Sequence, residues 1–102
     1  MGNIKIFISQ PMKGLSNEEI EDQRNACLED AKSILGEGVR EVPSFFKDDP
    51  DAKTNPVYCL GRSIQLMGEV DCVYFAKSWE EGRGCKIEHM IATEYGLKII
   101  KD

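Results

Sequence analysis

The stretch that decides the fold is Asp71-Cys-Val-Tyr-Phe-Ala-Lys-Ser-Trp-Glu-Glu-Gly-Arg-Gly-Cys-Lys-Ile-Glu-His-Met-Ile-Ala-Thr-Glu-Tyr-Gly96. Its short apolar run, residues 73–76, is typical of a buried strand, and a polar loop with two glycines follows. A helical pattern then covers residues 83–95 and stops at Gly96, since glycine is favoured just past a helix end. The stretch therefore predicts a strand, a loop and a helix in that order.

Glu88 is the residue of interest in this helix. The apolar face of the helix consists of Ile87, Ile91, Ala92 and Tyr95. Glu88 falls inside that face on a helical wheel, directly over Gly84. A carboxylate in a core-facing position is costly unless it is paired or used. Glu88 is therefore either a functional group at the mouth of a cleft or a structurally paired residue. The candidate ion-pair partners are Arg24, Arg62 and Arg83.

The composition is that of a single acidic globular domain. The chain has 102 residues, of which 41% are hydrophobic, and its formal net charge is −5. This length supports one modest core, and the acidic balance argues against binding of nucleic acid polymers. No apolar run reaches the length of a membrane span, and the N-terminal run is too short for a signal peptide. We expect one domain over residues 1–102, located in the cytoplasm with reduced cysteines and without a membrane partner.

The rest of the chain alternates strands and helices. Strands are expected over residues 3–9, 39–43, 70–76 and 97–100, and helices over residues 16–35, 57–68 and 83–95. Ser16 and Glu19 have the spacing of a capping box at the start of the first helix. This order predicts an α/β fold with three α/β/α layers and a four-stranded parallel sheet, as in flavodoxin-like proteins.

Ligands of such folds bind at the carboxyl ends of the strands. Three loops meet at that edge: a first loop of residues 9–14, a second of residues 45–56 and a third of residues 77–84. Glu88 lies one turn into the helix after the third loop, so it can face the crevice between them. The second loop is long enough for a functional lid, and its acidic residues are interpreted as solvated surface.

Four other side chains have both a structural and a functional interpretation. Arg24 lies in the apolar stripe of the first helix, and we favour an arginine that extends its head into water over an ion pair with a buried carboxylate. Asp71 is expected to cap nearby backbone amides, and His89 to lie on the surface. Cys85 and His89 have the spacing of metal ligands, but two ligands are too few, so no metal is expected.

Two sequence patterns resemble a known family. One is Ile6-Phe-Ile-Ser-Gln-Pro-Met-Lys-Gly14 after the first strand, and the other is residues 71–96 with the core Gly84-x-x-x-Glu88-His. Together they resemble the nucleoside 2-deoxyribosyltransferase superfamily, most closely its short, mostly uncharacterised branch from phages and bacteria. The resemblance implies a nucleoside 2-deoxyribosyltransferase-like fold. It also implies cleavage of an N-glycosidic bond in a nucleoside or its 5′-phosphate, by transfer or by hydrolysis.

The resemblance also assigns roles to individual residues. Glu88 is the implied catalytic nucleophile, which attacks the anomeric carbon of the sugar to give a glycosyl-enzyme intermediate. The implied substrate-binding residues are Ser9, Gln10, Pro11, Met12, Ser63, Ser78, Trp79, Arg83 and Gly84. Among them Ser78, Arg83 and the amides near Gly84 would hold a phosphate, while the first loop would border the sugar and base. Trp79 either stacks on the base or closes the core edge or a subunit contact.

Two positions depart from the family pattern. Ser63 and Gly82 stand where larger or transferase members of the superfamily carry aspartates. These departures favour an alternative, a catalytically silent nucleotide-binding or interaction module on the same fold. The expected partners are a small-molecule nucleoside or nucleotide and further copies of the chain in a homo-oligomer, and no cofactor is expected.

Overall fold

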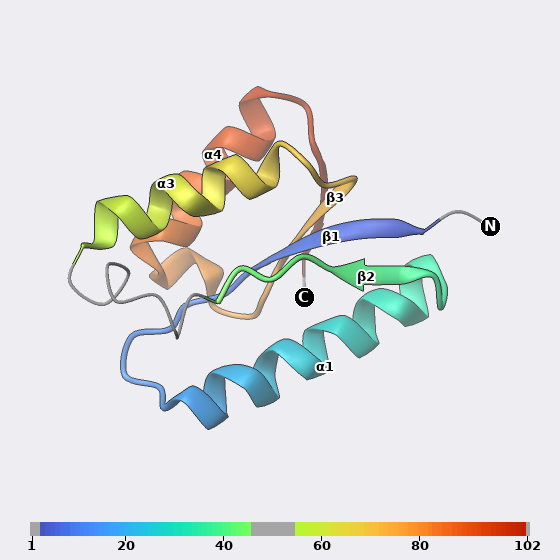
Figure 1. The fold of residues 1–102 in the computed structure, drawn as a ribbon, viewed down its shortest axis with the longest axis horizontal. Helices are drawn as coiled ribbons and strands as arrows, with labels where there is room; N and C mark the ends of the chain where they lie inside the picture. Colours follow the sequence, from blue (N-terminus) through green and yellow to red (C-terminus); the bar gives the residue numbers. More distant parts are fainter. Residues whose placement is uncertain (1–2, 46–54, 102) are drawn as a thin grey trace.

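The chain forms a three-layer α/β/α structure, seen in a computed structural model that describes residues 3–45 and 55–101. The strands are β1 (Ile4–Ser9), β2 (Val39–Glu41), β3 (Cys72–Phe75) and β4 (Lys98–Lys101). The helices are α1 (Asn17–Leu35), α3 (Pro56–Met67) and α4 (Arg83–Glu94), with a 3-10 turn, η1 (Trp79–Glu81), before α4. Figure 1 shows α1 on one face of the sheet and α3 and α4 on the other.

The sheet has four strands in the order β2-β1-β3-β4, and all its neighbouring strands are parallel. The predicted parallel sheet with helices on both faces is thus confirmed. The chain leaves β1 toward one edge through α1 and later returns to β3 on the other side of β1. The carboxyl ends of β1 and β3 therefore form the switch point at which ligands of such sheets bind. Ser9 pairs with Phe75 at this point.

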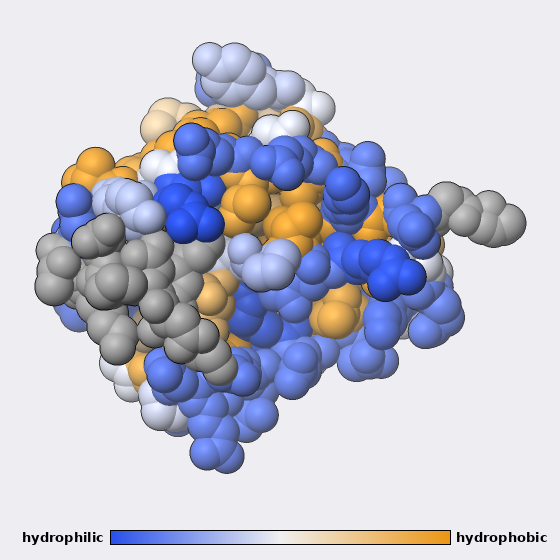
Figure 2. Space-filling view, in the orientation of Figure 1, coloured by the Kyte–Doolittle hydropathy of each residue, from blue (hydrophilic) through white to orange (hydrophobic). Residues whose placement is uncertain are grey.

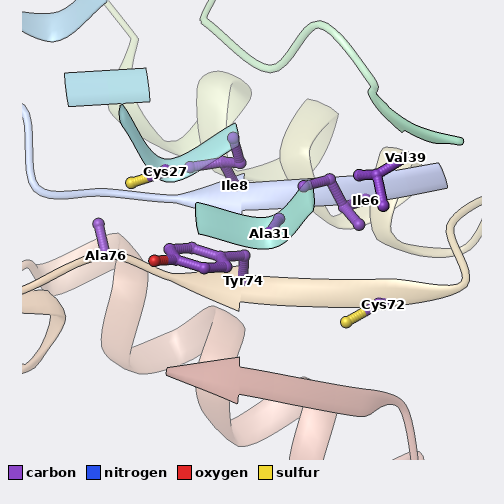
Figure 3. Close-up of a cluster of buried hydrophobic side chains, with 8 residues drawn as sticks. All are labelled: Ile6, Ile8, Cys27, Ala31, Val39, Cys72, Tyr74 and Ala76. Atoms are coloured by element: carbon purple, nitrogen blue, oxygen red, sulfur yellow. The ribbon is translucent and has the colours of Figure 1, made fainter. Parts of the chain in front are cut away.

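Strand β1 divides the core into two clusters because it is buried on both faces. Ile6 and Ile8 point toward α1, where they meet Cys27 and Ala31 (Figure 3). Phe7 points the other way and belongs to a second cluster that includes residues of α3 and α4. The alternation of side chains along β1 thereby sends Ser9 to the same face as Phe7, the face that α3 and α4 cover.

The helix ends follow local sequence signals. The predicted capping box is confirmed: Ser16 Oγ accepts from the Glu19 amide at 3.1 Å, and Glu19 Oε1 accepts from the Ser16 amide at 2.8 Å. Helix α3 begins with Pro56, after Asn55 Oδ1 accepts from the Tyr58 amide at 3.0 Å. These signals explain why α1 and α3 start within one residue of the predicted positions.

The predicted boundaries and one face needed correction. Strands β2 and β3 are shorter than expected, because pairing with β1 ends at Glu41 and begins at Cys72. Tyr95, predicted on the apolar face of α4, is 80% exposed, because α4 ends at Glu94 and the chain turns away. The possible lid and its acidic residues lie outside the described residues, apart from the ends of that loop.

The visible face of the molecule is mostly hydrophilic, with apolar surface gathered on the side of α3 and α4 (Figure 2). The large exposed apolar side chains on these helices include Val57 and Met90. In the two described ranges, no helix combines the length and the apolar character that a membrane crossing requires.

Candidate functional site

Three secondary-structure elements converge on the Glu88 carboxylate. Glu88 lies on α4 and is only 7% exposed. Its Oε1 accepts a hydrogen bond of 2.7 Å from Ser9 Oγ, at the last residue of β1. A second hydrogen bond comes from Ser63 of α3, and both serines are buried. The candidate site is therefore a buried carboxylate held by two hydroxyl groups at the switch point of the sheet.

Simple periodicity brings these residues together. The buried positions of α4 are Cys85, Glu88 and Ala92, which share one helical stripe. In β1 the face that α4 covers carries Phe7 and then Ser9, two positions apart. Ser63 is one turn before the buried Met67 on α3. The buried stripe of α4 and the facing side of β1 thus place Glu88 and Ser9 opposite each other between helix and sheet. There the hydrogen-bonding needs of each buried group are met by the other.

Burial dominates the ionisation of Glu88. It raises the pKa of the carboxyl group above its ordinary value of 4.5, because desolvation penalises the charged form. The hydrogen bonds from Ser9 and Ser63 and the positive charge of Arg24 act in the opposite direction. Glu88 belongs to neither of the ion pairs identified in the described ranges, Arg24–Glu41 and Lys32–Glu29. The interpretation of Glu88 as an ion-paired structural residue finds no support in the described ranges.

Cys85, which the sequence pattern paired only with His89, is a buried neighbour of Glu88. The thiol is 5% exposed, one turn before Glu88 on the same stripe. Burial raises its pKa to about 11, with a further increase from the Glu88 charge, so the thiol stays protonated and is not a nucleophile. A Cβ at Gly82 would lie 3.0 Å from Cys85 Sγ and 3.4 Å from Pro11 Cβ. The space that a larger residue would need at position 82 is therefore already taken.

Arg24 does not extend into water, so the favoured interpretation of this residue was wrong. The residue is 5% exposed. Its Nε donates to Glu41 Oε2 at 2.7 Å, its Nη1 donates to Gln10 Oε1 at 2.7 Å, and its Nη2 donates to Ser44 Oγ. All three partners lie at or beyond the carboxyl ends of β1 and β2. The buried guanidinium is stable there because each of its nitrogens has a partner.

Gln10 is engaged within the protein at both ends of its amide. Its Nε2 donates to Gln23 Oε1 at 2.7 Å, and its Oε1 accepts from Arg24. The side chain is 5% exposed and ties the end of β1 to α1. Gln10 therefore has a structural role, and its substrate-binding role stays a prediction. Its neighbour Met12 is half-buried, and its carbonyl accepts from the Leu15 amide at 3.1 Å.

The residues expected to hold a phosphate lie around the start of α4. Ser78 and Arg83 have exposed side chains, and Ser78 adopts a left-handed backbone with a φ of 67°. A Cβ at Gly84 would lie 4.0 Å from Leu60 Cδ1, so Gly84 faces α3. Helix α4 begins after Gly82 without a side-chain cap. No described hydrogen bond joins Ser78, Arg83 or Gly84 to Glu88. Their role in holding a phosphate stays a prediction.

His89 is not the surface residue that the helical wheel predicted. Its ring stacks on Trp79 with centroids 4.2 Å apart and meets the edge of Phe75 at 4.9 Å. Its buried Nε2 has no hydrogen-bond partner among the described residues. Trp79 packs against the core cluster of α3 and α4, which supports the core-edge alternative for this residue. At the opposite edge of the sheet, Asp71 Oδ2 accepts from the Lys5 amide at 2.9 Å, as predicted.

Two surface hollows are lined by described residues, and Glu88 lines neither. A hollow of about 360 Å³ lies at the amino ends of the strands, beside Asp71 and Lys98. One of about 290 Å³ lies between α1 and β2, beside Arg24 and Glu41. The described residues contain no group of three or more His, Cys, Asp or Glu side chains placed to hold a metal ion.

One comparison with known proteins gives a match. A family model described as "Domain of unknown function (DUF4406)" matches residues 4–101, which is nearly the whole chain. No curated protein and no solved structure matches the chain significantly. The function must therefore be argued from the site itself.

Replacing Arg24 tests the buried network. The Arg24→Met variant leaves Gln10, Glu41 and Ser44 without their shared donor, so we expect the free energy of unfolding to fall by about 3–5 kcal/mol. The control is Lys32→Met on the same helix, because Lys32 is half-buried, its partner Glu29 is 74% exposed, and the pair at 3.6 Å should contribute about 0.5 kcal/mol or less. Urea denaturation measures both variants. Equal losses in the two would contradict the network.

Glu88 should also give stability a measurable dependence on pH. Because its folded-state pKa is raised above 4.5, the folded protein binds the proton more tightly than the unfolded chain does. As pH rises from 4.5 through the folded-state pKa, the wild type should therefore lose stability relative to Glu88→Gln. Urea denaturation across this interval measures the difference, with Glu94→Gln at an exposed position of α4 as the control. Parallel curves for wild type and Glu88→Gln would show that burial does not raise this pKa.

Proposed function

The chain belongs to the DUF4406 family, a domain of unknown function, and we propose that it cleaves the N-glycosidic bond of a nucleoside or nucleoside 5′-phosphate. In this proposal the nucleophile is Glu88. The observation that supports it most is the buried carboxylate without an ion-pair partner, held by Ser9 at the switch point of the sheet. The resemblance of residues 6–14 and 71–96 to the nucleoside 2-deoxyribosyltransferase superfamily supports the same chemistry.

The proposed reaction has two displacement steps. In the first, a Glu88 oxygen bonds to the anomeric carbon while the bond from that carbon to the base nitrogen breaks. The bonding electrons leave with the base, which takes a proton from solvent. In the second step, water or another base attacks the same carbon, the glycosyl ester breaks, and the carboxylate is regenerated. A proton of the attacking group passes to solvent, so no redox partner is needed.

The surroundings of Glu88 suit a nucleophile that must be ionised yet reactive. Desolvation leaves its charge poorly solvated, which favours bonding to a carbon that develops positive charge. The hydrogen bond from Ser9 Oγ to Oε1 fixes the orientation of the carboxylate. Because burial raises the pKa of Glu88, the proposed rate should rise with pH until the carboxyl group is fully ionised.

A second candidate function is a binding module that keeps the crevice without turnover. The observation in its favour is that no second carboxyl group among the described residues contacts Glu88. Enzymes that cleave glycosidic bonds usually pair two carboxyl groups, one of which protonates the leaving group. By the resemblance, Ser63 stands where superfamily transferases carry an aspartate, and a side chain at position 82 would clash with Cys85. A nucleotide-binding or interaction role on the same fold follows from this arrangement.

The setting of the proposal is a homo-oligomeric cytoplasmic protein whose partner is a small nucleoside or nucleotide. Val57, Met90 and Tyr95 are exposed apolar side chains on or beside α3 and α4, which supports a subunit contact on that side. Within the described residues Cys27, Cys59, Cys72 and Cys85 form no disulfide, which supports a reducing compartment.

Release of free base is the direct test of the proposed function. We expect the wild type to release base from at least one member of a panel of ribonucleosides, deoxynucleosides and their 5′-monophosphates, measured by chromatography. The Glu88→Gln variant should lose roughly a thousandfold or more of that rate, because a neutral amide is a much poorer nucleophile than a carboxylate. Glu94→Gln, on the same helix, should keep the wild-type rate.

The same panel separates the two candidate functions. No release from any substrate, together with a saturable rise in melting temperature with one of them, would favour the binding module. Release that persists in Glu88→Gln would reject Glu88 as the nucleophile.

A further inference from the structure

The hydrogen bonds of Arg24 reach beyond the packing of α1 on the sheet to the end of β1 that carries Ser9. We infer that Arg24 is a positioning residue of the Glu88 site: it fixes the end of β1 that carries Ser9, and its charge acts on the Glu88 carboxylate from the α1 side of the sheet. The inference deepens the proposed function and rests on it only for the kinetic readout. Arg24 is not in contact with reacting atoms, so it is not a catalytic residue.

The hydrogen bonds of Arg24 bracket Ser9 on both sides. Nη1 donates to Gln10 Oε1 at 2.7 Å, and Gln10 directly follows Ser9. Nη2 donates to Ser44 Oγ, and Ser44 Oγ in turn donates to the carbonyl oxygen of Ile8 at 3.4 Å. Both chain neighbours of Ser9 are therefore tied to one guanidinium. Since the Ser9 hydroxyl donates to Glu88 at 2.7 Å, the position of this donor depends on the bracket.

This hydrogen-bonded arrangement around Ser9 is held in place because Gln10 and Ser44 are buried and cannot exchange their partners for water. Gln10 is 5% exposed and is also held by α1, through Gln23 Oε1 at 2.7 Å. Ser44 is likewise 5% exposed. Arg24 suits this place better than a lysine would, because its planar fork reaches three acceptors in fixed directions. The end of β1 is thus held by side-chain bonds at the point where its ladder ends.

The charge of Arg24 is offset only in part by its partner Glu41. The Arg24 side chain is 6% exposed, whereas that of Glu41 is 20% exposed, so water screens the carboxylate more than the guanidinium. Among the described residues, the charged group that acts on Glu88 is Arg24 from α1, while β1 and α3 supply the hydroxyl groups of Ser9 and Ser63. Cys85, on the same stripe of α4, is a protonated thiol and carries no charge. Arg24 is therefore the positive charge that opposes the cost of ionising the buried carboxylate.

Removing the positive and the negative member of the Arg24–Glu41 pair in separate variants distinguishes an effect on Glu88 ionisation from a general loss of stability. Arg24→Met should move the titration midpoint of Glu88 to higher pH, whereas Glu41→Gln should move it to lower pH. Carboxyl ¹³C NMR of glutamate-labelled protein follows the midpoint directly, with the Glu88 signal assigned from its absence in Glu88→Gln. On the acid limb of the base-release profile, Arg24→Met should lose about threefold or more in rate, and Glu41→Gln should gain.

Arg24→Lys completes the test, since it keeps the charge and loses the fork. We expect its midpoint to stay near that of the wild type while the plateau rate falls, because Ser9 is less well placed. If Arg24→Met does not fold, Arg24→Lys and Glu41→Gln still decide the matter. An unchanged midpoint in Glu41→Gln, or shifts in the same direction in Glu41→Gln and Arg24→Met, would overturn the inference. A wild type that releases no base would reject the proposed function, while the NMR titration would still judge Arg24.

Discussion

The structure depends on how one buried carboxylate is compensated. Glu88 occupies the centre of the stripe by which α4 packs onto the sheet, so the helix can dock only where polar groups meet it. Ser9 provides that meeting point with a bond of 2.7 Å, and it can do so because alternation along β1 sends it to the α4 face. The position of α4, the end of β1 and the candidate site are therefore consequences of the same hydrogen bond.

Buried polar residues are concentrated at one end of the sheet. They are Ser9, Gln10, Arg24, Ser44, Ser63 and Glu88. Residues 6–8 of β1 and all of β3 are apolar on both faces, which is the ordinary arrangement of a parallel sheet. Six polar side chains buried together cost more stability than apolar ones of similar size would, and proteins accept such costs mainly at functional sites. Energetic and topological grounds therefore agree in favouring the carboxyl end of the sheet as the candidate functional end.

Local patterns predicted the features that depend on local periodicity. The parallel sheet, the capping box at Ser16 and the burial of Glu88 all follow from periods of two or of 3.6 residues and from cap signals. Arg24 and His89 were misassigned because their partners come from elsewhere in the chain. The Arg24 partners Glu41 and Ser44 lie 17 and 20 residues away, and the His89 ring is covered by Trp79 from the preceding turn. A helical wheel shows the direction of a side chain but not the residues from other segments that pack against it.

The most direct test of the account is to look for the sugar on Glu88. A substrate found by base release would be mixed with the protein, quenched in acid and digested with trypsin, and the peptides weighed by mass spectrometry. The account predicts that the peptide of residues 87–98, which carries Glu88, gains the mass of the substrate minus that of the released base, with fragment ions that place the glycosyl group on Glu88. Base release with the sugar on another residue would contradict it.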